Sequence, residues 1–251
     1  MNAPKPLAVV IMAAGKGTRM KDPSKAKVMY EVLGKPMLHY VVELAKQLSA
    51  DRIIAIVGYQ RETIIQYLQI AHSEVEIAIQ AEQLGTGHAI MQTESLLIGY
   101  DCDLVVLSGD VPLLRFESMQ KLIVRHCQTK ADATVLTADF PDPTGYGRMI
   151  RGSTGEVLKI VEQKDATEDE RKVQEINSGI YVFDGRKLFE SIKHITPKNA
   201  QNEYYLTDVF AYFQKRSWNV QAEKTSSIEE IMGVNTVDQL ETVRSVLSQR
   251  K

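Results

Sequence analysis

The feature that most constrains the fold is an unbroken apolar run at residues 7–12, followed at once by small residues and glycines. A run of this length, rich in valine and isoleucine, is typical of a buried strand in a parallel sheet. Gly15 and Gly17 lack a Cβ and can adopt φ > 0, so the backbone after the strand can approach a ligand closely. Successive main-chain N–H groups would form an anion site beside Lys16 and Arg19. The pattern predicts a loop that binds a nucleotide phosphate.

The spacing of this loop excludes two familiar phosphate-binding sequences. A P-loop requires Gly-Lys-Ser or Gly-Lys-Thr after an earlier glycine, whereas Lys16 is followed by Gly17. A dinucleotide-binding loop requires a third glycine three residues after the second, and Met20 occupies that position. An ordinary tight turn after the strand stays open as the alternative.

Strand-like and helix-like segments alternate through the first half of the chain. Apolar runs predict further strands at 53–57, 75–79 and 104–107. Apolar residues at helical spacing predict helices at 37–48, 64–70 and 87–97. Pro36 is expected in the first turn of the first helix. Such alternation is typical of an α/β fold with an open parallel sheet. Ligands bind at the carboxyl ends of its strands, so the loops after Met12, Ile79 and Leu107 should meet at one edge.

The second half of the chain has a different pattern. Residues 133–138 and 180–183 predict strands, and 152–155 predict a hairpin turn. Apolar residues at helical spacing predict a helix between 206 and 213, and another over 236–251. The charged segment from 165 to 175 is expected to be a solvated helix or loop.

Composition narrows the class of protein. The 251 residues carry a net charge of −2, so the chain lacks the excess of positive charge that is typical of nucleic-acid-binding proteins. The apolar runs are strand-sized, so no membrane insertion is expected. The N-terminal residues lack an apolar signal core. Two cysteines, Cys102 and Cys127, make neither a disulfide framework nor a zinc site. Free thiols of this kind indicate a cytoplasmic protein.

Several motifs, in order along the chain, resemble one enzyme family. Residues 13–20, Ala-Ala-Gly-Lys-Gly-Thr-Arg-Met, resemble the signature loop of sugar-1-phosphate nucleotidyltransferases. The likeness extends from about residue 7 to residue 235, and it is closest to the uridyltransferase half of a bacterial bifunctional N-acetylglucosamine-1-phosphate enzyme. Its further motifs are 80–89 (Gln-Ala-Glu-Gln-Leu-Gly-Thr-Gly-His-Ala), 109–112 (Gly-Asp-Val-Pro), 142–148 (Asp-Pro-Thr-Gly-Tyr-Gly-Arg), 175–177 (Glu-Ile-Asn) and 203–205 (Glu-Tyr-Tyr).

This resemblance implies a Rossmann-like, open, mostly parallel sheet with a smaller antiparallel sugar-binding part in the second half. We expect a single nucleotidyltransferase domain over 1–251, with a nucleotide-binding part at about 7–130, a sugar-binding part at about 131–235 and a C-terminal helix at 236–251. The hexapeptide repeats that resemble the other half of the bifunctional enzyme are missing. Because the family's trimers resemble assemblies built by those repeats, a monomer or dimer is expected.

The implied reaction joins UTP to N-acetylglucosamine 1-phosphate and releases pyrophosphate. A phosphate nucleophile is already ionised near neutral pH, so the site needs cations and a metal rather than a general base. Asp110 directly follows a predicted buried strand, where a carboxylate could hold Mg²⁺; a turn or N-cap role is the alternative. By resemblance, Asp110 and Asn235 are the two metal ligands, with Mn²⁺ as a possible substitute for Mg²⁺.

Two cations are also implied by resemblance. Arg19 would stabilise the leaving pyrophosphate, and Lys27 would contact the nucleotide phosphates; with Asp110 these are the expected catalytic residues. The family usually places proline before this lysine, but Ala26 stands here and the segment is one residue longer. Lys25 is therefore a rival, and Lys27 is preferred because the two residues after it continue the family pattern.

The remaining site residues are also those that the resemblance to the family implies. Nucleotide-binding positions are Met12, Ala13, Ala14, Gly15, Lys16, Gly17, Lys27, Gln80, Gly85, Thr86, Ser108 and Gly109, and sugar-binding positions are Gly147, Glu162, Asn177, Tyr205 and Thr207. The Gln80 amide could present both a donor and an acceptor to uracil. His88 is expected to pack or to form a hydrogen bond rather than to catalyse.

Two alternatives stay open at this point. Close relatives often have tyrosine where this chain has Ser108, so the same chemistry on another sugar, such as glucose 1-phosphate, is the nearer one. The other is a catalytically silent nucleotide-sugar sensor. Such proteins typically lose the loop cations or metal ligands, which are all present here.

Overall fold

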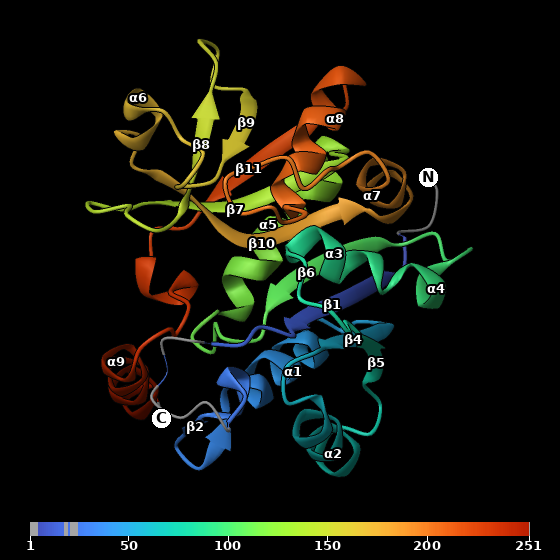
Figure 1. Ribbon diagram of the computed structural model, residues 1–251, viewed down its shortest axis with the longest axis vertical. Coiled ribbons are helices and arrows are strands. Elements are labelled where there is room, and N and C mark those ends of the chain that lie inside the picture. The colour runs from blue at the N-terminus through green and yellow to red at the C-terminus, as the bar shows by residue number, and fades with distance from the viewer. Residues whose placement is uncertain (1–4, 18–19, 21–24, 251) are drawn as a thin grey trace.

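The structure is a computed structural model that describes residues 5–17, 20 and 25–250. Its centre is a sheet with the strand order β11-β7-β10-β6-β1-β4-β5, and the hairpin β8–β9 branches from β10 (Figure 1). The strands of this sheet are β1 (Leu7–Ala13), β4 (Arg52–Val57), β5 (Glu76–Ile79), β6 (Asp103–Ser108), β7 (Ala133–Asp139), β8 (Gly147–Arg151), β9 (Val157–Val161), β10 (Glu175–Asp184) and β11 (Val220–Lys224). A separate small ribbon pairs β2 (Glu31–Val32) with β3 (Lys35–Pro36).

The helices follow the strands in the expected alternation through the first half. They are α1 (Met37–Gln47), α2 (Arg61–Ala71), α3 (Thr86–Met91), α4 (Glu94–Leu97), α5 (Phe116–Thr129), α6 (Glu168–Arg171), α7 (Gly185–Ile192), α8 (Val209–Lys215) and α9 (Val237–Gln249). Short 3₁₀ helices also connect these elements, at η1 (Lys27–Met29), η2 (Leu206–Asp208) and η3 (Ile228–Ile231).

Strand direction confirms the expected mostly parallel sheet with a smaller antiparallel part. β1 pairs in parallel with β4 and β6, as do β4 with β5 and β7 with β11. β10 is antiparallel to both β6 and β7, and the hairpin β8–β9 is antiparallel to its neighbours. One sheet therefore runs without a break from the first half of the chain into the second.

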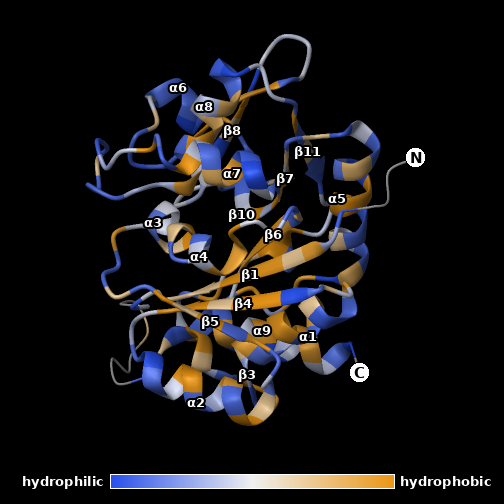
Figure 2. Ribbon diagram, turned by 90° about the vertical axis from the view of Figure 1, so that its right-hand side faces the viewer, coloured by the Kyte–Doolittle hydropathy of each residue, from blue (hydrophilic) through white to orange (hydrophobic). Residues whose placement is uncertain are grey.

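The unbroken apolar run of β1 is explained by burial on both faces of the sheet. Val9 and Ile11 pack on one face, against α1, α2 and α5. Ala8 and Val10 pack on the other face, against α3, α7 and α8. Figure 2 shows β1 and β4 as hydrophobic strands enclosed between helices that carry hydrophilic outer surfaces. A strand covered on both sides needs apolar residues at every position.

Several local expectations need correction. The helix expected at 87–97 is two short helices, because the Thr93 hydroxyl and amide both donate to the Ile90 carbonyl and end α3. Pro36 lies in β3 and precedes α1 as its N-cap, rather than occupying the first helical turn. The strand expected at 180–183 begins earlier, at Glu175, with an irregularity between Asn177 and Tyr181. The patterns considered did not predict β11, the helices α5 and α7, or the β2–β3 ribbon.

Candidate active site

The carboxyl ends of the parallel strands β1, β5 and β6 meet at one edge, as predicted. The loops after these strands surround a cavity of about 540 Å³. It is lined by Met12, Ala13, Ala14, Gly15, Lys16, Gly17, Lys27, Val28, Gln80, Gln83, Gly85, Thr86, Ala89, Ser108, Asp110 and Glu203. Its floor is the end of β1 and the glycine-rich loop.

All of the predicted nucleotide-binding residues line this cavity except Gly109, which lies behind the lining residues. The backbone N–H of Gly109 donates to the Met12 carbonyl at 2.9 Å, and a Cβ on Gly109 would lie 3.0 Å from Val28. Gly109 therefore supports the lining without belonging to it. Arg19, predicted to stabilise the leaving group, lies outside the described residues.

Four lining residues were not predicted as site residues: Val28, Gln83, Ala89 and Glu203. Gln83 and Ala89 belong to the 80–89 motif and Glu203 to the 203–205 motif, so both motifs contained the signal. Val28 follows Lys27 in η1 and is buried, and the apolar character of its side chain gave no indication of a place in the pocket.

The predicted catalytic and metal-binding side chains converge on one ammonium group. Lys27 Nζ donates to Asp110 Oδ2 and, at 3.0 Å, to Asn235 Oδ1. The Asp110 carbonyl accepts from the Val234 N–H at 3.0 Å, which fixes the 233–235 segment beside the end of β6. Gly233, in this segment, lies close to the carboxylate: a Cβ on Gly233 would be 3.3 Å from Asp110 Oδ2.

This donor set fits a hard divalent cation. A carboxylate oxygen of Asp110 and an amide oxygen of Asn235 approach the same cationic atom, Lys27 Nζ. Oxygen ligands of these two kinds are those that Mg²⁺ accepts, usually with water and substrate phosphates completing the coordination. Asp110 and Asn235 lie far apart in the sequence, so their pairing depends on the tertiary fold.

The two rival lysines occupy different places. Lys27 lines the cavity, whereas the Lys25 ammonium lies over the Tyr30 ring, 5.4 Å from its centroid. A Cβ on Gly17 would lie 2.6 Å from the Lys27 Cβ, so the glycine loop packs directly against this lysine. Of the two lysines, Lys27 is therefore the one placed against the glycine-rich loop.

Gln80 holds the loop that follows it. It is almost fully buried, and its Nε2 lies 3.1 Å from the Gly85 carbonyl and 3.2 Å from His88 Nδ1. Both amide donors are therefore engaged within the protein, which differs from the expectation that Gln80 presents a donor and an acceptor to a base. His88 has the hydrogen-bonding role expected of it.

The loop at 84–87 is joined to the segment at 203–206. The Tyr204 N–H donates to the Leu84 carbonyl at 2.8 Å, and the Gly87 N–H donates to the Tyr204 carbonyl at 2.7 Å. The Leu206 N–H donates to the Thr86 hydroxyl at 3.0 Å. Gly85 lies in this junction with φ 110° and ψ 174°, a conformation open almost only to glycine.

Gly85→Ala should therefore destabilise the protein by about 2 kcal/mol through backbone strain. The added Cβ would also lie 2.6 Å from the Tyr204 carbonyl oxygen, so the loop must move. We expect the KM for the nucleotide to rise by about tenfold or more, measured by steady-state kinetics beside a thermal melt. Gly99→Ala is the matched control, since Gly99 has φ 75° and open space around its Cβ position. A similar KM change in both variants would contradict the role assigned to the junction.

The predicted sugar-binding residues form a second group. A Cβ on Gly147 would lie 3.4 Å from Glu162 Oε2 and 3.5 Å from the Asn177 Cβ, and the Thr207 hydroxyl donates to Glu162 Oε1 at 3.0 Å. Asn177 Nδ2 donates to the Tyr181 hydroxyl at 2.7 Å. Tyr205 precedes η2, which contains Thr207.

These residues and Asn235 are not among those that line the 540 Å³ cavity. Ser108, which lines the cavity, lies beside the irregular part of β10: a Cβ on Gly179, two residues after Asn177, would lie 3.9 Å from the Ser108 hydroxyl. The strand that carries Asn177 thus adjoins the cavity at the end of β6.

The sugar-side group is rich in carboxylates. Desolvation raises the pKa of Glu162, and the nearby charges of Asp208, Asp165 and Glu203 add to the rise. Burial, with Asp165 beside it, raises the pKa of Asp208 to about 6. Ionised carboxylates accept hydrogen bonds from sugar hydroxyls, so these groups suit a neutral polyhydroxyl ligand.

Glu162→Gln should stabilise the protein by about 1 kcal/mol at neutral pH. A carboxyl whose pKa is raised by folding costs stability as pH rises from its unfolded pKa through its folded pKa, and glutamine removes that cost. The Tm difference between variant and wild type should therefore shrink as pH falls below the unfolded pKa of glutamate. Thermal melts across pH measure it, with Asp208→Asn as a separate variant. A Tm difference that does not change with pH would contradict this electrostatic explanation.

The arrangement defines a class of protein: an α/β fold in which a glycine-rich loop after a buried strand lines a cavity beside a lysine, a carboxylate and an amide. The family comparison is more specific. The sequence model of the Nucleotidyl transferase family matches residues 8–242, and this chain belongs to that family. The expected nucleotidyltransferase class is thereby confirmed.

Relatives of known name agree with this assignment. The chain is 46% identical over 241 residues to the bifunctional protein GlmU of Limosilactobacillus reuteri, covering 96% of this chain and 52% of that protein. Identity to the GlmU of Latilactobacillus sakei is also 46%, covering 96% of this chain and 51% of that protein. The chain thus spans about half the length of the curated relatives it matches.

Solved structures share the fold. A UDP-glucose pyrophosphorylase complexed with UDP-glucose matches with a TM-score of 0.79 at 18% identity, covering 99% of this chain and 100% of that one. A putative glucose-1-phosphate thymidylyltransferase from Bacillus anthracis matches with a TM-score of 0.75 at 22% identity, covering 96% and 94%. Among the described residues, no helix is both long and apolar enough to cross a membrane.

Proposed function

We propose that this chain transfers a uridylyl group from UTP to N-acetylglucosamine 1-phosphate, giving UDP-N-acetylglucosamine and pyrophosphate. The observation that carries the proposal is the convergence of Lys27, Asp110 and Asn235 beside the glycine-rich loop. The similarity to GlmU proteins supports the choice of substrates.

In this reaction the protein's task is to position and to neutralise charge. The backbone of 13–17 would bind the triphosphate, and the loop at 80–87 would hold the base. Lys27 would place its positive charge on the phosphates, and Asp110 with Asn235 would bind Mg²⁺, or Mn²⁺ in its place. The bound ion would supply further charge neutralisation at the α-phosphate and at the leaving pyrophosphate.

The sugar phosphate would be held by the second group of residues. Glu162, Asn177 and Thr207 offer carboxylate, amide and hydroxyl groups to sugar hydroxyls and to an N-acetyl group. The sugar phosphate oxygen is ionised near neutral pH, so the attack in line with the α-phosphorus requires no proton transfer to a base.

The nearest alternative is the same reaction on another sugar 1-phosphate, because Ser108 lines the cavity beside the strand that carries Asn177. A second is a silent nucleotide-sugar sensor. Pyrophosphate release with Mg²⁺ distinguishes them when UTP, dTTP, CTP and GTP are crossed with N-acetylglucosamine, glucosamine, glucose and mannose 1-phosphates.

We expect turnover to be highest with UTP and N-acetylglucosamine 1-phosphate. A maximum with another sugar would keep the reaction and change the substrate. No turnover in any combination, together with calorimetric binding of UTP, would overturn the proposal in favour of the sensor.

A further inference from the structure

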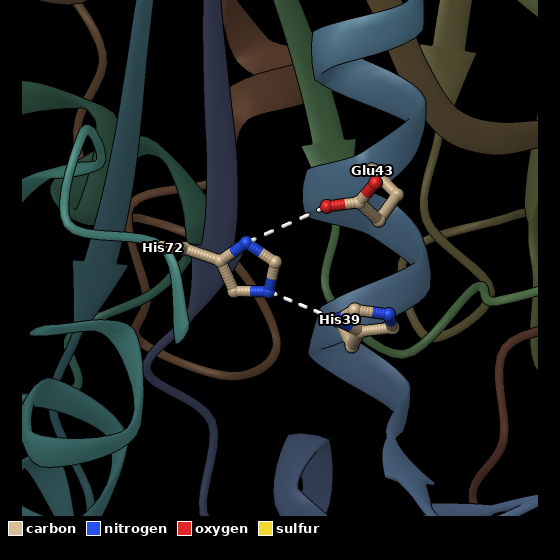
Figure 3. A group of neighbouring side chains, drawn as sticks. All are labelled: His39, Glu43 and His72. Carbon is tan, nitrogen blue, oxygen red and sulfur yellow. Dashed lines mark hydrogen bonds and ion pairs between the residues drawn. The ribbon is translucent and has the colours of Figure 1, made fainter. Parts of the chain in front are cut away.

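A second group of metal-binding side chains lies outside the cavity and the sugar-side group. His39 is in the first turn of α1, Glu43 follows one turn later, and His72 follows the end of α2. Figure 3 shows the His72 ring between the two α1 side chains, with one ring nitrogen toward each of them. One ligand atom from each residue lies within 4.8 Å of the others.

The two imidazoles are already close to a coordinating arrangement. His39 Nδ1 and His72 Nε2 are 3.0 Å apart. Two nitrogens bound to a tetrahedral Zn²⁺ at about 2.0–2.1 Å lie about 3.3 Å from each other, so binding would require only a small separation of the rings. Imidazole nitrogen with one carboxylate is a donor set that suits Zn²⁺ and its neighbours rather than Mg²⁺.

His72 is held rigidly, as a metal ligand requires. It is 2% exposed, and its ring contacts His39 and Tyr67, with centroid separations of 5.0 Å and 5.8 Å. Burial lowers the pKa of both His39 and His72, which favours the neutral imidazole, the form that binds metals.

The Lys46 side chain lies at the second ring nitrogen of His72, Nδ1. Its ammonium lies 3.0 Å from His72 Nδ1 and can only donate, so Nδ1 accepts and Nε2 carries the ring proton toward His39. Lys46 also pairs with Glu43 at 3.0 Å and with Glu74 at 2.5 Å. The ammonium thus sets the tautomer that keeps Nε2 from binding a metal.

Withdrawal of Lys46 would reverse this tautomer. The ring proton would then be free to move to Nδ1, on the side where Glu43 Oε1 lies 3.6 Å away and Glu74 Oε1 lies 4.0 Å away. A carboxylate that moves in to accept from the second nitrogen of a metal-bound histidine is a common support for such sites, and Glu74 is placed to do so. Nε2 of His72 and Nδ1 of His39 could then bind one ion, and the Glu43 carboxylate would turn from Nδ1 toward that ion to supply the third ligand.

We propose that His39, Glu43 and His72 form a binding site for a divalent transition-metal ion of the Zn²⁺ type, for which the Lys46 ammonium competes. The site is chemically distinct from the oxygen-donor pair Asp110 and Asn235. It joins α1 to the end of α2, so an ion bound there crosslinks two helices on the same face of the sheet.

Isothermal calorimetry with Zn²⁺ tests the proposal, in excess Mg²⁺ to saturate oxygen-donor sites. We expect one equivalent to bind and to raise the Tm. His39→Gln, which keeps an acceptor for His72, should weaken binding by at least about tenfold. Lys46→Met should strengthen it by about tenfold or more, because it removes a competing positive charge.

Matched variants distinguish this site from adventitious binding. His194 is exposed and lies outside the cluster, and Lys215 is in the last turn of α8 as Lys46 is in the last turn of α1. His194→Ala and Lys215→Met should leave Zn²⁺ affinity unchanged. Two outcomes overturn the proposal: no saturable binding to wild type or to Lys46→Met, or binding that His39→Gln does not weaken. Nucleotidyl transfer with Mg²⁺ should be the same in His39→Gln and wild type, so the test is independent of the proposed reaction.

Discussion

Asp110→Ala should reduce the rate of pyrophosphate release by about 10³-fold or more, since it removes the carboxylate that can hold the cation and leaves Lys27 with one partner fewer. The fold should persist. The contact between Asp110 and the 233–235 segment uses the main-chain carbonyl, which alanine retains. Circular dichroism and a thermal melt would verify this beside the kinetic assay.

Asp139→Ala is the matched control for the loss of a carboxylate. Asp139 is exposed at the end of β7, where its side chain pairs with Lys224. This variant should keep wild-type turnover. If Asp110→Ala kept it as well, the proposed metal ligand would be wrong, and a turn-forming role for Asp110 would be the better explanation.

Lys27→Met should lower kcat/KM by about 10²-fold, because it removes a positive charge from beside the glycine-rich loop, where we propose that the phosphates bind. Methionine keeps most of the aliphatic length that packs against Gly17. The effect should therefore appear in kinetics rather than in the Tm. Steady-state measurements with varied UTP would provide both kcat and KM.

Lys25→Met provides a close comparison, since Lys25 is two residues away and carries the same charge. Its ammonium lies over the Tyr30 ring, and it should change kcat/KM by less than a few fold. A reversed result, with Lys25→Met the more damaging, would assign the phosphate contact to Lys25 and show that the additional residue in this segment shifts the active lysine.

The parts of the fold that were predictable are those with a strong local pattern. The apolar run of β1 could be interpreted without tertiary information because burial on both faces requires apolar residues throughout. The same pattern located β4 and β6. From strand direction alone it also followed that three loops share one edge.

Some of the parts that were missed do have a local pattern: α5 and α7 carry apolar residues at helical spacing. Others have no such pattern. β11 is an edge strand of half-buried residues, in which only Ala222 is fully buried, so its apolar signal is weak. The break between α3 and α4 depends on one threonine whose hydroxyl bonds a carbonyl three residues earlier, and this choice has no periodic signature. In the irregular part of β10, the Gly179 N–H donates to Asn177 Oδ1 and the Ile180 N–H donates to the Ser178 hydroxyl, and these short-range bonds leave no mark on strand periodicity.

The candidate site shows the same division. The glycine-rich loop and the carboxylate after β6 follow from strand–loop patterns within a few residues. Asn235 and Glu203 lie far along the chain from the loops they approach, and no spacing rule predicts that approach. Family motifs indicated Asn235, but the proximity of Asn235 to Lys27 required the fold. The hydrogen bonds of the Gln80 amide likewise could not be predicted, because they depend on where the Gly85 carbonyl and the His88 ring lie in the fold.

The sheet that runs unbroken from β11 to β5 restricts how this protein can move around its substrates. β10 is hydrogen-bonded to β6 on one side and to β7 on the other, so the nucleotide and sugar sides have no linker about which to hinge. Rotation of one half against the other would break a central ladder of the sheet. Enclosure of substrates must come instead from small displacements at the rim, in the loops beyond the strand ends and in the β8–β9 branch (Figure 1).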